Sequence, residues 1–433
     1  YINCVKVVHK PKHKIQSKSL KVKKFMGGTL MDYNLIKLVV IFAIIVAIIW
    51  AKKPLHWAFI VGTVATAVIC MIPIKECGEV IVGVLTSWGK MAIVLDIYLI
   101  TFLQRLLDKR KQIQKAQVDM INLFNNRIVN ALLIPIIIGF LPSPAALVLC
   151  GEIVNEATGD YMNAKEKAII TSYFRHIPES FLPTYPVILL LCGFSGLPIS
   201  SFVIAMLPPV TILFVVGYFI FLRKLPTKTG IEITVSKKDA AVSLFKHIWS
   251  LVLIMVLIMG VGLSVEISIG IVLLISFFVY KVTPKEIAQL LPKAFDKVMI
   301  LSTLMIFIFQ GFLSHAGVLA SLITAFQTLP IPAYIMFALL IFVGGVLTGA
   351  QGIIAVVAPL AFAAIPNFGV PLVMLLGCFA WASNQLSPTH VCVVVAANYF
   401  KVDFSDMVRQ VIPCLAVYLA FTFAYYHVLL LFM

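Results

Sequence analysis

Two interrupted apolar stretches decide the fold of this chain: residues 182–185 read Leu-Pro-Thr-Tyr, and residues 387–390 read Ser-Pro-Thr-His. An apolar run follows each of them, to Leu191 in the first case and to Ala397 in the second. The two stretches lie 205 residues apart. A proline–threonine pair inside an apolar segment ends one helix and allows another to begin.

The same offset relates further positions upstream of the two stretches. It pairs Gly139 with Gly344, and Ser143 with Thr348, without a gap. This shared register favours an internal duplication. Matching interruptions in corresponding hydrophobic segments are typical of secondary transporters, in which they lie at the substrate site. The sequence therefore predicts a secondary transporter.

The composition places the chain in a lipid bilayer. Of its 433 residues, 61% are hydrophobic and 12% are charged, and the mean hydropathy is +1.05. A water-soluble domain of this size needs far more polar surface. The apolar runs are continuous, whereas the strands of an outer-membrane barrel alternate apolar and polar residues. We therefore predict an all-α integral membrane protein.

Part of the formal net charge of +16 comes from the N-terminal segment. Residues 1–30 carry eight lysines and no acidic residue. Such a segment is either a basic arm for anionic lipid or nucleic acid, or sequence that does not belong to the natural protein. We favour the second interpretation, a non-native or disordered extension, and expect no nucleic-acid partner. The rest divides into a first repeat at 31–225, a cytoplasmic linker at 226–245 and a second repeat at 246–433.

Both halves show the same succession of segments. Three apolar runs come first, followed by an amphipathic segment, an interrupted hairpin, a broken span and a final span. In the first half these fall at 34–51, 55–73, 85–104, 105–127, 128–158, 165–197 and 199–222. In the second half they fall at 247–264, 266–280, 296–312, 314–329, 332–365, 370–400 and 409–432.

The two hairpins decide how the halves are related. A re-entrant hairpin enters and leaves by the same face and adds no crossing, so each half crosses the membrane five times. An odd number of crossings turns the second half upside down, which is the inverted-repeat architecture. Irregular backbone at membrane depth is tolerated only where protein or a polar cavity covers it. We therefore expect the four breaks to meet at the centre.

Lysine and arginine in the loops predict the orientation. Under the five-crossing scheme the basic loops share one face, at 52–53, 105–115, 223–238, 281–285 and 401–409. The opposite face carries a loop at 74–79 with one lysine. The basic face is therefore cytoplasmic, both termini lie outside, and the protein is expected in a prokaryotic plasma membrane.

The hairpin breaks are predicted anion sites. Ser143 has the character of an N-cap and Pro144 that of a first helical residue, so a helix restarts there. Thr348 and Gly349 take the same place in the second hairpin. The free N–H groups and positive dipole end of each half-helix would point to the bundle centre. The alternative is that proline and glycine only kink packed helices.

The broken spans supply a second pair of half-helix N-termini, at Thr184 and Thr389, with Asn384 and Ser387 just before the second. Hydroxyls and amides there can bind the carboxylate and hydroxyl groups of a small anion, and freed carbonyls can bind a cation. The predicted substrate-binding residues are Ser143, Pro144, Arg175, Thr184, Thr348, Gly349, Asn384, Ser387 and Thr389.

Arg175, His176 and Glu179 form a cluster of ionisable residues within an interrupted span. An ionisable group at membrane depth is costly and indicates function. Arg175 can clamp a carboxylate with two hydrogen bonds, and Glu179 or His176 can carry a coupling proton. The alternative is an Arg175–Glu179 pair that only fixes helix geometry. Asp96, a lone carboxylate in the third span, is a further candidate proton or ion site.

Enzyme and cofactor motifs are weak. Residues 193–196 fit the Gly-x-Ser-Gly pattern of rhomboid-type intramembrane serine proteases, but the accompanying His-x-x-x-Asn is absent, which favours a turn. There is no Walker loop. The eight cysteines form no Cys-x-x-Cys pair and no Cys/His cluster at metal spacing. We expect no catalytic residue, no cofactor and no metal; a membrane-embedded hydrolase is the alternative function.

The order of segments, repeated twice, resembles the ion transporter superfamily, which includes gluconate, citrate and dicarboxylate permeases. Residues 139–144 (Gly-Phe-Leu-Pro-Ser-Pro) and 385–390 (Gln-Leu-Ser-Pro-Thr-His) resemble in particular an uncharacterised prokaryotic membrane family assigned to it. The likeness covers about 31–433.

The resemblance implies a homodimeric carrier of a small organic anion that works by alternating access and is coupled to protons or sodium ions. Sodium-coupled dicarboxylate members carry Ser-Asn-Thr at each hairpin tip. Here only Ser143 and Thr348 correspond to tip residues, which leaves sodium coupling open. The gluconate-type branch, with similar glycine- and proline-rich hairpins, makes proton symport the alternative.

Overall fold

A computed structural model gives the structure of the chain and describes residues 19–51, 53–140, 146–230, 233, 235–318, 330–365 and 367–432. Within these ranges the secondary structure is helical and contains no β-strand, so the predicted all-α class is confirmed. One isolated bridge pairs Asn126 with Lys228.

The described residues of the first half form ten α-helices. They are α1 (Ser19–Trp50), α2 (Leu55–Ile69), α3 (Ile74–Leu85), α4 (Trp88–Lys109), α5 (Gln112–Phe124), α6 (Arg127–Gly139), α7 (Ala146–Thr158), α8 (Ala164–His176), α9 (Pro186–Ser195) and α10 (Ile199–Gly217). Two 3-10 turns, η1 (Gly159–Tyr161) and η2 (Pro178–Ser180), flank α8, and the π-helical η3 (Tyr218–Leu222) extends α10.

The described helices of the second half follow the same order of long and short segments. They are α11 (Lys237–Met255), its π-helical extension η4 (Val256–Val261), α12 (Val265–Val279), α13 (Pro284–Ala294), α14 (Lys297–His315), α16 (Ala333–Thr348), α17 (Ala350–Ala364), α18 (Val370–Leu386), α19 (Val391–Phe400) and α20 (Phe404–Leu430).

By length and composition, five helical segments can cross a membrane among the described residues. They are α10 with η3, α11 with η4, α14, α18 with α19, and α20. The pair α3 and α4, bent by 58°, makes a sixth if it is counted as one span. The segment of α18 and α19 is also the most buried of the five, with 83% of its window inside the protein, so it forms the centre of the bundle.

Several boundaries differ from those expected from the sequence. The loop expected at 74–79 is the start of the amphipathic helix α3, and α13 begins at Pro284 with Thr283 as its N-cap. Helix α11 begins within the expected linker, and α1 within the expected basic extension. The short helices α3 and α13 carry charged residues in their first turns and are too short to span, so a hydropathy pattern does not separate them from loops. Of the amphipathic segment 314–329, residues 319–329 lie outside the described part of the chain.

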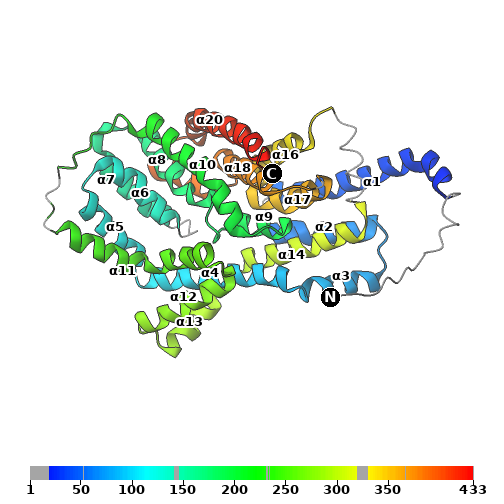
Figure 1. The fold of residues 1–433 in the computed structure, drawn as a ribbon, viewed down its shortest axis with the longest axis horizontal. Coiled ribbons are helices and arrows are strands. Elements are labelled where there is room, and N and C mark those ends of the chain that lie inside the picture. The colour runs from blue at the N-terminus through cyan, green and yellow to red at the C-terminus, as the bar shows by residue number, and fades with distance from the viewer. Residues whose placement is uncertain are drawn as a thin grey trace, which may run out of the picture.

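The helices pack as two groups. In one group α2 contacts α14, α4 contacts α12, α13 and α14, and α3 contacts α14. In the other, α9 packs against α17 and α18, α19 packs against α7 and α8, and α10 packs against α20. Figure 1 shows α2, α3 and α14 at one end of the molecule, α5, α7 and α11 at the other, and α9 and α18 between them. The groups touch through α4 with α9 and α14 with α17.

Ion pairs join loops that are distant in sequence. Glu286 of α13 contacts the Lys109 ammonium at 3.0 Å and the Arg110 guanidinium at 2.9 Å. The hydrogen bond from Lys109, with that from Arg110 and both positive charges, holds the pKa of Glu286 below its usual value. A second ion pair joins His315, the last residue of α14, to Glu76 in the first turn of α3, at 2.7 Å. The end of α4 therefore meets the start of α13, and the start of α3 meets the end of α14.

Candidate functional site

The first broken helix lies between α8 and α9. Helix α8 ends at His176 because Pro178 has no N–H for the helical ladder and restricts the backbone of the residue before it. The 3-10 turn η2 follows, and the Leu182 N–H donates to the carbonyl of Pro178 at 2.9 Å. Helix α9 then starts with Pro186 at its first position. The break expected from the sequence is confirmed.

The second broken helix lies between α18 and α19, where Pro388 interrupts the chain. The Ser387 hydroxyl donates to the carbonyl of Val346 in α16 at 2.8 Å and contacts the Thr389 hydroxyl at 2.8 Å. The Thr389 N–H donates to the Ser387 hydroxyl at 3.3 Å. Ser387 therefore fixes this break against the second hairpin.

A single residue, Gly349, joins the two helices of that hairpin. Its φ of +83° and ψ of 151° belong to a region that is accessible essentially to glycine alone. The N–H of Ala350, at the start of α17, donates to the Asn384 side-chain oxygen at 3.0 Å. A Cβ added to Gly349 would lie 3.6 Å from the Thr389 hydroxyl. The hairpin tip therefore lies directly on the second break.

Thr348 belongs to the same tip but is bonded within its own helix. Its hydroxyl donates to the carbonyl of Gly344 at 2.8 Å. Helices α16 and α18 can approach closely because residue Gly345 has no side chain: an added Cβ would lie 2.7 Å from the Cβ of Ser383. The structure thus brings together the predicted residues Thr348, Gly349, Asn384, Ser387 and Thr389.

A buried ion pair occupies the first break. The side chain of Arg175 is 1% exposed, and its Nη1 lies 3.4 Å from Oε1 of Glu179, whose side chain is 11% exposed. The same Nη1 lies 3.5 Å from the sulfur of Cys392 in α19. A buried guanidinium needs such partners because an uncompensated charge in a low dielectric costs several kcal/mol, on the order of the stability of a whole domain.

The two breaks touch each other at His176 and His390. Their Nε2 atoms are 2.9 Å apart, and Glu179 lies 3.8 Å from His176 and 3.9 Å from His390. Trp381 of α18 donates its indole N–H to the carbonyl of His176 at 2.6 Å. The ionisable cluster predicted on α8 therefore extends across to α19.

A small cavity links these groups to the hairpin tip. It has a volume of about 30 Å³, and its lining includes Glu179, Tyr185, Ala350, Trp381 and Asn384. That volume suits one water-sized group. The hydroxyl of Tyr185 donates to the carbonyl of Gly139 and thereby ties α9 to the first hairpin. Both broken helices and the N-terminus of α17 thus converge on one point inside the protein.

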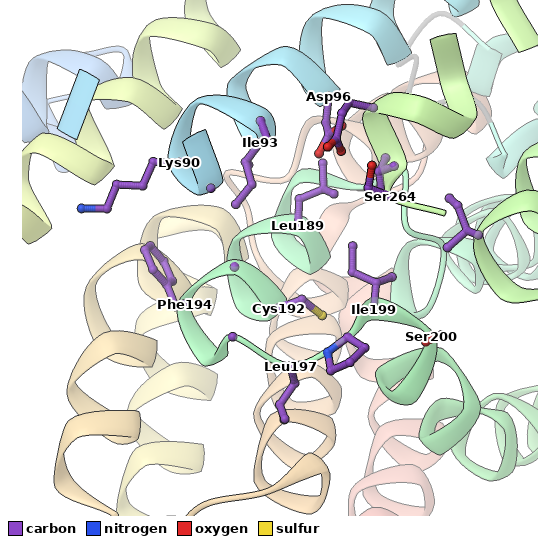
Figure 2. A pocket seen from close by; sticks show the side chains of 18 of the residues that line it. Lys90, Ile93, Asp96, Leu189, Cys192, Phe194, Leu197, Ile199, Ser200 and Ser264 are labelled. Atoms are coloured by element: carbon purple, nitrogen blue, oxygen red, sulfur yellow. The ribbon is translucent and has the colours of Figure 1, made fainter. Parts of the chain in front are cut away.

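Asp96 lies elsewhere. It lines a larger cavity of about 630 Å³ where α4, α9, α12 and α14 meet, as Figure 2 shows together with Lys90, Cys192 and Ser264. Arg175, His176 and Glu179 are not among the described residues that line it. The structure therefore separates Asp96 from the ionisable cluster at the breaks, with α9 bordering both cavities.

The comparison with protein families adds one result to this geometry. Residues 34–429 match the model of a family described as a protein of unknown function, DUF401. The chain belongs to the DUF401 family. No curated protein matches it.

The described contacts do not assign every predicted residue of this DUF401 chain to the cluster. Ser143 and Pro144 lie outside the described residues. Thr184 is half-buried, and its hydroxyl is buried without a hydrogen bond to any described residue. A common cavity for Ser143, Thr184, Thr348 and Thr389 therefore stays a prediction.

Two residues of the DUF401 cluster, His390 and Cys392, were not predicted from the sequence. His390 occupies the position in the second half that Tyr185 occupies in the first, directly after the proline–threonine pair. A titratable side chain at that point of both halves was a usable signal. Cys392 carried none, because a cysteine in an apolar run is usually a small buried hydrophobe.

Proposed function

We propose that this DUF401 protein is a secondary transporter that moves a small organic anion by alternating access. The observation that carries the proposal is that two broken helices and a hairpin tip converge on one cavity lined by Glu179, the ion-pair partner of the buried Arg175. Interrupted helices at a common depth are how transporters expose backbone groups to a substrate away from water. A guanidinium among them supplies charge for a carboxylate.

The inverted repeat is part of the same proposal. The described helices recur in the same order in both halves, so that α2 corresponds to α12, α4 to α14, α7 to α17 and α9 to α19. Their contacts come in matching pairs: α2 packs against α14 as α12 packs against α4, and α7 packs against α19 as α17 packs against α9. His176 and Trp381, which are 205 residues apart and so equivalent in the two halves, contact each other directly. Equivalent positions meet in this way near a two-fold axis, which supports an inverted repeat with re-entrant hairpins and five crossings per half.

We infer that the substrate binds at the half-helix N-termini of α9, α17 and α19. The start of α17, the Thr389 hydroxyl beside it and the guanidinium of Arg175 all favour a negative charge. A ligand at the Ala350 N–H would take the place of the Asn384 oxygen that this N–H bonds in the structure. Asn384 and Ser387 fix the tip and the break against each other rather than facing a ligand. This role is supported by their hydrogen bonds to α17 and α16.

Coupling to protons or sodium ions follows from the same set of residues. Glu179 lies between Arg175, His176 and His390, so it is well placed to gain or lose a proton together with a neighbour. Sodium would need backbone carbonyls of the segment between α8 and α9, where those of Ile177, Pro178 and Leu182 already accept hydrogen bonds from the chain itself. Proton coupling has the more specific support, because the ionisable groups contact one another directly.

Alternating access would move one helix group past the other. The 630 Å³ cavity lies between α4, α12 and α14 on one side and α9 on the other, where the two groups meet. Movement there would open or close a route from the cavity toward the breaks. We also propose that the protein is a homodimer in the plasma membrane of a prokaryote, because the sequence resembles the ion transporter superfamily.

Replacement of Thr389 by valine is expected to weaken substrate binding about ten- to a hundredfold, because a lost hydrogen bond to a charged ligand costs roughly 1.5–3 kcal/mol. Valine keeps the shape of threonine, so the fold should be unchanged. The measurement is counterflow of labelled substrate in proteoliposomes, after a thermal-shift panel of carboxylates, polyols and oxyanions has identified a ligand. Thr211→Val is the control, since this exposed threonine bonds only to its own helix.

The same proteoliposomes separate the two classes of function. A carrier accumulates labelled substrate by exchange, whereas a membrane-embedded hydrolase releases product without accumulation. Normal counterflow by the Thr389→Val variant would remove Thr389 from the proposed site. Product formation without exchange would overturn the transporter proposal itself.

The proposed orientation predicts which loops face the cytoplasm. Lys109 and Arg110 meet Glu286, and Lys165 meets Asp406, so each contact joins segments of the two halves that the five-crossing scheme assigns to the cytoplasmic face. Single cysteines at Lys111 and Lys237 are therefore expected to resist an impermeant thiol reagent in intact cells. A cysteine at Lys75, whose side chain is 90% exposed, is expected to react.

The control for this labelling uses inside-out vesicles, in which the pattern should reverse. The background must lack accessible native thiols, Cys70 and Cys77 among them. Labelling of all three positions from one side would contradict five crossings per half, whereas a fully reversed pattern would overturn only the orientation.

A further inference from the structure

Four side chains at the meeting of the two breaks carry atoms that ligate metal ions. They are His176, Glu179, His390 and Cys392, and one ligand atom from each lies within 4.8 Å of all the others. We propose that this cluster binds a transition-metal ion of the zinc class, held by two imidazoles, one thiolate and one carboxylate. The proposal stands independently of transport, because it concerns binding of the ion alone.

The distances are close to those of a tetrahedral site. Zinc bonds of about 2.0–2.1 Å to nitrogen and 2.3 Å to sulfur place the ligand atoms of a tetrahedron about 3.3–3.7 Å apart. In the structure the two Nε2 atoms are 2.9 Å apart, and Glu179 oxygens lie 3.8 Å and 3.9 Å from them. Shifts of less than an ångström would bring these nitrogen and oxygen atoms to tetrahedral spacing, and the Cys392 sulfur lies within 4.8 Å of them.

The imidazole of His176 is already oriented for this role. Its Nδ1 lies 2.6 Å from the carbonyl oxygen of Ser172, and a carbonyl only accepts, so Nδ1 carries the proton. In the neutral ring Nε2 then presents its lone pair to His390 and Glu179. A backbone carbonyl that holds the second ring nitrogen is the usual support of a metal-bound histidine.

The charges of the cluster favour a cation. With Glu179 and Cys392 ionised, two negative charges face the one positive charge of Arg175, whose Nη1 contacts both side chains. The balance is one net negative charge, which attracts a metal cation; a divalent ion would bring the cluster to one net positive charge.

The donor set indicates the class of metal. Nitrogen and sulfur ligands suit zinc and neighbouring transition metals, whereas magnesium, calcium and sodium prefer oxygen ligands. His176 is fully buried and the side chain of His390 is 19% exposed, so the ion would enter past His390. Because its ligands come from α8, η2 and α19, a bound ion would join the two broken helices.

The test uses purified protein without a polyhistidine tag, stripped with a chelator and titrated with cobalt(II). We expect one saturable site per chain, with the visible bands of tetrahedral cobalt and a near-ultraviolet thiolate-to-cobalt band, both displaced by zinc. Cys392→Ser should abolish the thiolate band, and His390→Gln should weaken binding about a hundredfold or more, since even loss of an outer partner costs about 10–100-fold. Cys150→Ser is the matched control, because this buried thiol bonds to the Thr171 carbonyl outside the cluster.

Variants that fail to fold are recognised by gel filtration and circular dichroism. X-ray absorption on the unsubstituted zinc-loaded protein then supplies the same answer, with one sulfur at about 2.3 Å and nitrogen or oxygen ligands at about 2.0–2.1 Å. Absence of sulfur from that spectrum, or no saturable binding by folded protein, would overturn the proposal. Cobalt binding that survives both Cys392→Ser and His390→Gln would do the same.

Discussion

Replacing Arg175 with methionine is expected to destabilise the folded protein by about 3–5 kcal/mol and to abolish transport. The substitution fills the space with an apolar side chain of similar length but leaves Glu179, 11% exposed, without its buried cation. An uncompensated carboxylate in that environment is more costly than the lost ion pair itself. The measurement is unfolding in detergent, followed by fluorescence and far-ultraviolet circular dichroism, beside counterflow in proteoliposomes.

Two further variants separate the structural from the functional role of Arg175. In the double variant Arg175→Met with Glu179→Gln, part of the lost stability should return, because neither charge remains buried alone. Arg175→Lys keeps the charge but loses the planar fork, so we expect near-normal stability with loss of substrate affinity. If Arg175→Met unfolds like the parent, the buried pair does not hold this part of the fold. Normal transport by Arg175→Lys would contradict the proposal that Arg175 clamps a substrate carboxylate.

Adding one methyl group at Gly139 is expected to destabilise the protein by about 1–3 kcal/mol or more. Gly139 is buried at the end of α6, where a Cβ would overlap the carbonyl oxygen of Arg175 and lie 3.1 Å from Pro178. A backbone carbonyl cannot turn aside as a side chain can, so α6 and α8 must separate. Because that movement displaces the first break, the Gly139→Ala variant should also lose transport at temperatures where it stays folded.

Two other glycines provide matched controls for this experiment. Gly344, the equivalent position of the second half, would place its Cβ against the flexible end of Ile353, so Gly344→Ala should cost less. Gly270 in α12 has nothing within 4 Å of an added Cβ, and alanine there should be neutral or stabilise by up to about 1 kcal/mol through its helix propensity. Equal effects at Gly139 and Gly270 would contradict the close approach of α6 to α8.

The local course of the chain could be predicted from its sequence. The breaks before α9 and α19 were located because proline removes an N–H and excludes helical geometry within a few residues, whatever lies around it. The hairpin turn at Gly349 was located from a local backbone property too, the conformational freedom of glycine. The helices α3 and α13 were missed, because their short charged patterns carry too little hydropathy signal to be told from loops.

The sequence by itself thus determined an all-helical membrane protein with matched breaks, and it placed Arg175, His176 and Glu179 within the first of them. Only the tertiary structure decided that His390 and Cys392 join this cluster and that Asp96 lines a different cavity. The reason is physical. His176 and His390 are 214 residues apart, and their contact depends on how α8, α18 and α19 pack, a sum over many long-range interactions that no local pattern encodes.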